Sequence, residues 1–216
     1  MSPCSDPLDG ARAELAASDP VMAELIERLG DRSVAQRRRG IPKPDAFGAL
    51  MRTVVGQQVS VAAARTIYGR VLDVFDGRAP APEEVLAVGE EPLRAAGLSG
   101  RKVTYIRDLA THVIDGRLEV GRLEDLSDEK VIEEIVAVRG FGQWSAEMFL
   151  IFHLERPDVI SGGDLGIRRA IQLSHEMDEM PTPQEVAEIG QRWMPHRSLA
   201  SIYLWESLAK TPADAD

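Results

Sequence analysis

The stretch VIEEIVAVRGFGQWSAEMFLIFHLERPDVISGGDLGIRRA, residues 131–170, carries the strongest structural signal of the chain. Apolar residues recur at helical spacing on both sides of an interruption, Arg139-Gly140-Phe141-Gly142. The pattern predicts two helices joined by a tight turn. The glycines allow a sharp turn and leave backbone N–H groups at the start of the second helix, where the helix dipole favours an anion. An ordinary pair of packed helices with a glycine stop would show the same pattern.

An acidic residue follows the second of these helices. Asp164 comes directly after the small residues Ser161-Gly162-Gly163, which can bring its carboxylate to the start of a helix predicted at Leu165–Leu173. Aspartate is also a favoured N-cap residue. The same side chain can therefore cap this helix and present a negative charge to a ligand.

The motif VRGFGQWSA at residues 138–146, with Gly163-Asp164-Leu165-Gly166 after it, resembles the helix-hairpin-helix DNA glycosylases. The similarity is closest to their 3-methyladenine-DNA glycosylase II branch, and it extends over roughly residues 45–210. In that family the hairpin grips the DNA backbone and the following aspartate is catalytic. The resemblance therefore implies that Gly140, Phe141 and Gly142 bind DNA and that Asp164 is the catalytic residue.

The resemblance also implies a domain organisation. The fold is expected to be all-α, with two helical lobes flanking a DNA-binding cleft. Residues 45–151, which include the hairpin, are expected to form one lobe. Residues 1–44 and 152–216 are expected to form a second, discontinuous lobe, and the two lobes together make one catalytic unit.

Composition limits the remaining possibilities. A chain of 216 residues with 44% hydrophobic content can bury a sizeable core. No segment approaches the roughly 18 apolar residues that cross a membrane, and the N-terminus has no signal pattern, so we expect a cytoplasmic protein without membrane contact. The single Cys4 excludes an internal disulfide and the iron–sulfur cluster of some relatives.

The net charge of −10 argues against a broad electrostatic DNA binder. A hairpin that binds phosphate through backbone N–H groups needs fewer cations, however. The basic residues also gather locally, at Arg37-Arg38-Arg39 with Lys43, at Arg101-Lys102, at Arg139, at Arg168-Arg169 and at Arg192 and Arg197. We therefore predict modest, salt-sensitive affinity for DNA.

Cap and stop signals place further helices. The predicted boundaries are Asp19-Pro20 and Gly30 for the first clear helix, Asp45 and Ser127 as N-caps, a helix opened by Thr182-Pro183-Gln184-Glu185 that continues through Trp193, and a final helix at Ser198–Lys210. Residues 31–44 are predicted to be a linker, and its arginines to be a solvated loop. Strand patterns are few.

Three segments outside the hairpin resemble family segments near DNA. The loop Gly56-Gln57-Gln58-Val59-Ser60 resembles the loop that enters the minor groove, which implies that Gln57 and Gln58 contact DNA and that Gln58 fills the gap left by a flipped base. A plain turn between helices would also explain the two glutamines. Arg101 and Lys102, and Arg197 in the Trp-x-Pro-x-Arg-Ser segment, are implied to lie near DNA.

The resemblance assigns substrate binding to Trp144, Met148, His196 and Phe47. Trp144 would offer an aromatic face to a cationic base, although a core tryptophan would fit the same pattern. Met148 stands where some relatives have tyrosine and His196 where some have tryptophan, and Ser161 replaces a frequent proline. These differences predict a more open pocket.

Relatives that also cut the DNA strand have a lysine at the position of Trp144, so the resemblance implies a monofunctional glycosylase. No cofactor is required by it. The family does imply a monovalent cation, Na⁺ or K⁺, held by the backbone carbonyls of Val136, Val138 and Phe141. His112, His153 and His175 lack ligand spacing, so no catalytic metal is predicted.

The predicted activity is removal of alkylated bases, 3-methyladenine above all and 7-methylguanine as a further substrate, from damaged double-stranded DNA by a monomer. Two alternatives stay open. One is a glycosylase for uracil, hypoxanthine or mismatched thymine. The other is a non-catalytic helix-hairpin-helix module that binds DNA.

Overall fold

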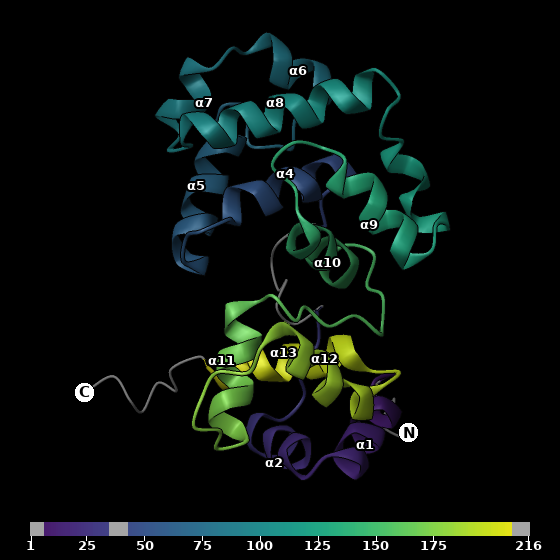
Figure 1. The fold of residues 1–216 in the computed structure, drawn as a ribbon. Helices are drawn as coiled ribbons and strands as arrows, with labels where there is room; N and C mark the ends of the chain where they lie inside the picture. Colours follow the sequence, from purple (N-terminus) through teal and green to yellow (C-terminus); the bar gives the residue numbers. More distant parts are fainter. Residues whose placement is uncertain (1–6, 35–42, 209–216) are drawn as a thin grey trace, which may run out of the picture. The chain divides into compact units, whose positions relative to one another are not determined.

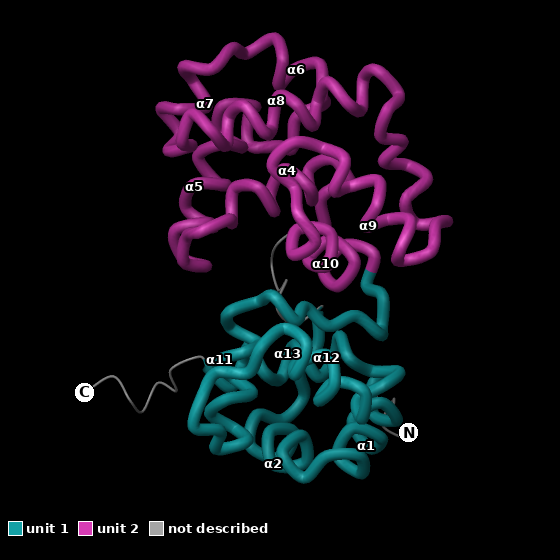
Figure 2. The backbone as a smooth tube through the Cα atoms, viewed as in Figure 1, with its two compact units in different colours: residues 1–41, 155–216 teal, residues 42–154 magenta. Residues whose placement is uncertain are grey.

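The computed structural model describes residues 7–34 and 43–208, and every regular element within these ranges is helical (Figure 1). The prediction of an all-α fold is confirmed. Figure 2 shows two compact units, unit 1 with residues 1–41 and 155–216 and unit 2 with residues 42–154. These boundaries lie a few residues from the predicted ones. Arg37-Arg38-Arg39 and Cys4, which entered the sequence arguments, lie outside the described residues.

Unit 2 is organised around one buried helix, α4. The unit contains α4 (Ala46–Gly56), α5 (Val61–Asp73), α6 (Pro82–Ala87), α7 (Glu91–Ala95), α8 (Gly100–Ile114), the 3-10 helix η1 (Val120–Asp125), α9 (Asp128–Val136) and α10 (Gln143–Phe152). Helix α4 packs against α5, α8 and α10, and α6 covers another part of α8. Leu50, Met51, Val54 and Val55 of α4 have no exposed surface. This central position explains why α4 is apolar on more than one face.

Short polar side chains fix where the helices of unit 2 begin. Asp45 Oδ1 accepts the N–H of Gly48 at 2.7 Å at the start of α4. Ser60, Ser99 and Ser127 cap α5, α8 and α9 in the same way. Each cap satisfies an N–H group that the first helical turn leaves without a partner. The predicted N-caps Asp45 and Ser127 are confirmed.

Unit 1 is built on the last described helix of the chain, α13. The unit contains α1 (Asp9–Ser18), α2 (Pro20–Leu29), α11 (Leu165–Ser174), α12 (Pro183–Gly190), the 3-10 helix η2 (Gln191–Trp193) and α13 (Arg197–Ser207). All residues from Ser198 to Leu204 are buried, because α2 and α11 both pack on α13. The core that results joins both ends of the chain: Leu15, Met22, Leu25, Ile167, Ala170, Ile171, Val186, Trp193, Leu199, Ala200, Tyr203 and Leu204.

The helices predicted in unit 1 are present, with three differences from the prediction. Asp19 caps α2, and Thr182 and Glu185 form the predicted capping box. The sequence did not predict α1, whose docking depends on a polar contact, Arg12 Nε to the Tyr203 hydroxyl at 3.1 Å. The helix opened by Thr182 becomes 3-10 after Gly190, and the last helix begins at Arg197 instead of Ser198.

The structure gives each of the three histidines without ligand spacing a local neighbour. His112 Nδ1 lies 2.9 Å from the Asp108 carbonyl, His153 stacks on Phe149, and His175 lies against Trp193. Among the described residues, 7–34 and 43–208, no cluster of three or more His, Cys, Asp or Glu side chains could hold a metal ion. None of the helices in these ranges combines the length and apolar character that crossing a membrane requires.

Gly140 is predicted to be essential for the fold of unit 2, while Gly142 is not. Gly140 has φ +88°, and a Cβ there would overlap the ring of Tyr105. Gly140→Ala should therefore lower the free energy of unfolding by at least about 2 kcal/mol, through strain and overpacking together. Denaturant unfolding followed by circular dichroism measures this loss.

Gly142→Ala is the matched control for this prediction. Gly142 has φ −124°, and a Cβ there would meet no other atom within 4 Å. Its replacement should cost less than about 1 kcal/mol, since the residue acts only as an N-cap. Equal losses in the two variants would show that the Tyr105 ring moves aside easily, contrary to this account.

Candidate nucleic-acid interface and catalytic residue

The predicted hairpin is present in unit 2. Helix α9 ends at Val136 and α10 begins at Gln143. Between them Phe141 donates its N–H to the Val138 carbonyl at 3.1 Å, and the Phe141 side chain is buried, which anchors the turn. Gly142 is exposed and caps α10 with its backbone. The start of α10 therefore presents its dipole at the surface of the unit, as an anion site requires.

Helix α8 packs against this turn. The Tyr105 ring fills the space that a side chain at Gly140 would need. One turn further, Asp108 Oδ2 accepts the backbone N–H of Arg139 at 3.0 Å. Positions three apart on a helix lie on the same face. One face of α8 thus fixes both the shape of the turn and the direction of its backbone.

Gln57 connects the second predicted DNA element to the hairpin. Its Nε2 donates to the Gly140 carbonyl at 3.0 Å and to Ser145 Oγ at 3.2 Å. The amide nitrogen is therefore engaged inside unit 2, and the contact of Gln57 with DNA stays a prediction. Gln57 positions the loop after α4 against the hairpin.

Lys102 has a comparable internal role. Its ammonium donates to the carbonyls of Val55 at 2.8 Å and Gln57 at 2.7 Å, at the end of α4. Partial burial of this ammonium lowers the pKa of Lys102 below its ordinary value. These carbonyls bind the ammonium within unit 2, and the contact of Lys102 with DNA stays a prediction. Arg101, its neighbour, is exposed, and its DNA contact stays a prediction.

Gln58 stands at the exposed tip of the loop that Gln57 and Lys102 hold. Its backbone is left-handed, with φ +56°, a conformation that residues other than glycine adopt rarely. Beside it Val59 is 37% exposed and Val61 is 80% exposed. The sequence placed Val59 in the loop without a role, and the exposed apolar surface of both valines is evident only in the structure.

The predicted pocket residues of unit 2 differ in exposure. Trp144 lies in the first turn of α10 and is partly exposed. Met148, one turn later, is 8% exposed, and Phe47 in α4 is 3% exposed. Trp144 is thus the member of this set with the most surface available to a ligand.

Asp164 caps α11 in unit 1, as the sequence allowed. Its Oδ1 accepts the N–H of Ile167 at 2.8 Å. The same oxygen accepts the indole Nε1–H of Trp205, on α13, at 2.9 Å. Trp205 is a residue that the sequence analysis missed, because only tertiary packing brings α13 to the start of α11.

Arg197 and Ser198 hold the loop that leads to Asp164. The guanidinium of Arg197 binds the Asp158 carboxylate through two nitrogens, at 2.7 and 3.0 Å. Ser198 Oγ accepts the N–H of Val159 at 3.0 Å and donates to the Arg156 carbonyl at 2.6 Å. The charge of Arg197 is thus paired with Asp158 within unit 1, and its contact with DNA stays a prediction.

His196 also has an internal partner. Its Nε2 lies 2.8 Å from Glu14 Oε2 on α1. The sequence placed His196 in the wall of a substrate pocket, and the contact with Glu14 ties one ring nitrogen to the protein instead. Its role as a pocket residue stays a prediction.

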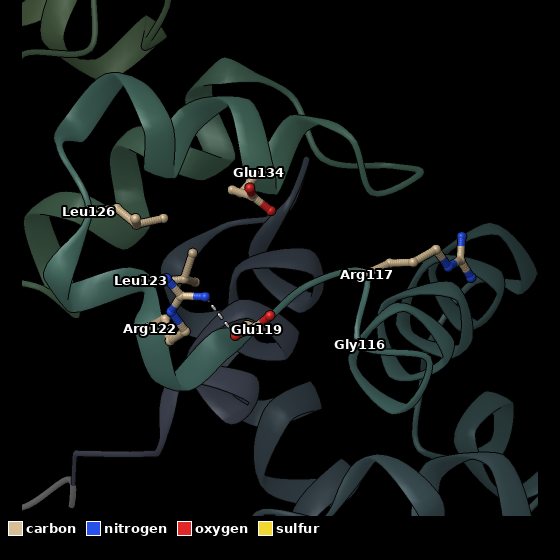
Figure 3. Close-up of a pocket in the computed structure, with 7 residues that line it drawn as sticks. All are labelled: Gly116, Arg117, Glu119, Arg122, Leu123, Leu126 and Glu134. Carbon is tan, nitrogen blue, oxygen red and sulfur yellow. Dashed lines mark hydrogen bonds and ion pairs between the residues drawn. The ribbon is translucent and has the colours of Figure 1, made fainter.

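One hollow in unit 2 is unrelated to these residues (Figure 3). It has a volume of about 240 Å³ and is lined by Gly116, Arg117, Glu119, Arg122, Leu123, Leu126 and Glu134. Arg122 pairs with Glu119 at 3.1 Å across it. The lining has no aromatic side chain to stack on a base and includes none of the predicted site residues, so we do not assign it to the site.

Comparisons with known proteins agree with the motif. The model of the HhH-GPD superfamily of base excision DNA repair proteins matches residues 51–196. DNA-3-methyladenine glycosylase 1 of Schizosaccharomyces pombe is 32% identical over 202 residues, which cover 93% of this chain and 87% of that protein. DNA-3-methyladenine glycosylase 2 of Escherichia coli is 25% identical, with 94% of this chain and 71% of that protein covered.

Solved structures show the same relationship. The S. pombe 3-methyladenine DNA glycosylase in complex with abasic DNA has a TM-score of 0.84 at 32% identity, with 92% of this chain and 96% of that chain covered. DNA-3-methyladenine glycosidase from Bacillus halodurans has a TM-score of 0.75 at 36% identity, with 96% and 93% covered. The chain belongs to the HhH-GPD superfamily of base excision DNA repair proteins. Within it, the relatives above are 3-methyladenine glycosylases, as the motif implied.

The position of Lys102 yields a prediction about the loop that carries Gln58. Lys102→Met keeps an apolar stem of similar length but removes two hydrogen bonds from the ammonium, each worth about 1.5–3 kcal/mol when charge-assisted and well buried, and less here at partial exposure. Backbone amides of residues 57–60 should exchange with deuterium faster, and excision should fall with them.

Arg101→Met is the control, since Arg101 precedes Lys102 and is exposed. It should leave exchange in the loop unchanged, while it weakens DNA binding and reduces the salt dependence of that binding. If Lys102→Met left loop exchange unchanged but weakened DNA binding as Arg101→Met does, Lys102 would be a phosphate ligand after all.

Proposed function

We propose that this protein is a monofunctional DNA glycosylase that removes alkylated bases, 3-methyladenine and also 7-methylguanine, from duplex DNA in base excision repair. The observation that carries the proposal is similarity along nearly the whole chain to a 3-methyladenine DNA glycosylase seen with abasic DNA, at a TM-score of 0.84. The hairpin, the Gln58 loop and Asp164 supply the chemistry that this reaction requires.

The hairpin serves to hold the DNA backbone. An enzyme that cuts a base from its sugar must first turn the nucleotide out of the duplex. Backbone N–H groups and the dipole at the start of α10 suit a phosphate next to the lesion. Such contacts read the backbone and not the sequence, as repair of scattered lesions demands.

Gln58 serves as the wedge that replaces the flipped base. It stands at an exposed loop tip with a constrained backbone, and Gln57 and Lys102 hold the loop from both sides. Exposed Val59 and Val61 add apolar surface, which suits entry into a minor groove. A rigid loop loses little conformational entropy when it enters the duplex.

Asp164 serves to stabilise the sugar as the glycosidic bond breaks. The bonding electron pair leaves with the base, the sugar gains oxocarbenium character, and water adds to C1′ while its proton is released. A carboxylate facing that carbon stabilises the developing positive charge. An alkylated purine is already cationic, so it leaves without a strong general acid.

Trp144 serves as the stacking surface for the cationic base. A cation over an indole face is worth about 0.5–2 kcal/mol. Met148 is nearly buried and His196 is bound to Glu14, so fewer flat side chains than in some relatives surround the base. Selectivity then follows the weak glycosidic bond of charged lesions, and neutral lesions such as hypoxanthine are released slowly.

The proposal includes a monovalent cation at the hairpin. Val136 ends α9, where the last helical carbonyls lack helical partners, and Val138 and Phe141 lie in the turn. Carbonyl oxygens of this kind suit Na⁺ or K⁺. A bound cation would add positive charge near the phosphate site. We further propose that the protein acts as a monomer in the cytoplasm.

The decisive experiment removes the charge of Asp164 while keeping its shape. In Asp164→Asn the amide oxygen can still accept from Ile167 and Trp205, so the cap survives. Single-turnover release of base from methylated duplex DNA should fall by about a hundredfold or more, while affinity for the duplex is kept.

Asp164→Ala separates this role from that of the cap. It should lose base release and, in addition, about 0.5–2 kcal/mol of stability. Undiminished turnover in Asp164→Asn would favour a non-catalytic DNA-binding module or another acid. Preferred release of uracil, hypoxanthine or mismatched thymine by the wild type would favour the glycosylase for neutral bases.

The wild-type protein should leave an intact abasic strand, because Trp144 occupies the position of the lyase lysine. Borohydride should therefore trap no covalent complex between the protein and DNA during turnover, since no Schiff base forms. A related lyase with an active lysine is the positive control. A trapped adduct would identify a lysine nucleophile elsewhere in the chain and end the monofunctional assignment.

A further inference from the structure

Two donors converge on one oxygen of the Asp164 carboxylate. The backbone N–H of Ile167 lies 2.8 Å from Oδ1, and the indole Nε1 of Trp205 lies 2.9 Å from the same atom. The first donor belongs to α11, which Asp164 caps, and the second to α13. An N-cap requires only the hydrogen bond between the aspartate and the helix that it caps. The hydrogen bond from the indole is therefore an additional constraint, and it comes from a different helix of unit 1.

Gly166 provides the room for this contact. A Cβ at Gly166 would lie 3.0 Å from Asp164 Oδ1, 3.1 Å from Trp205 Cδ1 and 3.2 Å from its Nε1. These separations are tighter than ordinary van der Waals contact. The backbone of Gly166 is helical, so a glycine is not required there by conformation. The close approach of the indole to the carboxylate is what requires it.

We infer that Trp205 is a positioning residue for base excision: its indole N–H fixes the plane of the Asp164 carboxylate. The inference rests on the proposed catalytic role of Asp164. A carboxylate that stabilises an oxocarbenium ion acts only in the correct orientation, and donors fixed before the reaction set that orientation.

The charged side chains around this contact have other partners. On α11, Arg168 Nε donates to the Pro181 carbonyl and Arg169 to Gln172. On α13, Arg197 binds Asp158, and Glu206 lies 3.9 Å from Arg32. On α12, which packs against α11, Glu185 bonds Thr182 and Glu188 bonds Gln184. Among the described residues of unit 1, the indole of Trp205 donates a hydrogen bond to the Asp164 carboxylate.

Unit 1 contains a matched pair that serves as a control. Trp193 Nε1 donates to Asp19 Oδ2 at 2.8 Å, and Asp19 caps α2 as Asp164 caps α11. This second tryptophan is fully buried, and the proposal gives it no part in excision. Loss of either indole N–H removes a bond to a capping aspartate. Only the loss at Trp205 should change the chemistry of the reaction.

The experiment compares Trp205→Phe with Trp193→Phe in the full chain. Single-turnover release of base from methylated duplex DNA is measured together with duplex affinity and thermal stability. Trp205→Phe should slow release about tenfold, equivalent to one hydrogen bond to a charged group, while duplex affinity is kept. Trp193→Phe should lose stability and keep the wild-type single-turnover rate.

Gly166→Ala provides a second variant that keeps the indole. Alanine favours the helix, so stability should not fall through propensity, while the added methyl group pushes the indole from the carboxylate. Its single-turnover release rate should fall as that of Trp205→Phe does, with duplex affinity kept. This variant carries the test if Trp205→Phe fails to fold.

The outcomes separate this inference from the proposed function. If Asp164→Asn loses activity but both variants keep the wild-type rate, Trp205 is only a packing residue and the inference is wrong. An equal loss of release rate in Trp193→Phe would also overturn it. If Asp164→Asn itself keeps full activity, the proposed role of Asp164 fails first.

Discussion

Three side chains on one face of α8 hold the parts of unit 2 that the proposed enzyme uses on DNA. Lys102 binds the carbonyls at the end of α4, the Tyr105 ring supports Gly140, and Asp108 accepts the N–H of Arg139. Gln57 closes the arrangement by joining the loop to the turn. The wedge loop and the phosphate-binding turn are thereby parts of one rigid assembly, so a shift in either would be transmitted to the other through α8.

In unit 1 the corresponding contacts position a single carboxylate, that of Asp164. Arg197 and Ser198 at the start of α13 bind the loop at residues 156–159, and Trp205, later on the same helix, binds the aspartate that follows the loop. The buried helix α13 thus fixes both the path of the loop at residues 156–159 and the orientation of the Asp164 carboxylate. Burial of α13 gives these contacts their rigidity, because interior side chains have few alternative positions.

These internal contacts bear on the net negative charge of the protein. Lys102 and Arg197, which the sequence offered as cations for DNA, bind the protein's own carbonyls and carboxylate. Their contacts with DNA stay predictions. An overall charge of −10 is compatible with DNA binding when backbone N–H groups at a helix start carry much of the contact.

The sequence by itself determined most of the helices, their caps and the hairpin, because periodicity, capping and glycine turns are local. The motif around Gly140 and Asp164 also indicated the family correctly. Only the tertiary structure showed the internal partners of Gln57, Lys102 and Arg197, since long side chains of this kind can reach many acceptors. It also brought Trp205 to Asp164 and packed α1 on the core through Leu15, with a hydrogen bond from Arg12. These contacts join residues far apart in the chain, and no local pattern specifies such partners, because packing of whole helices sets them.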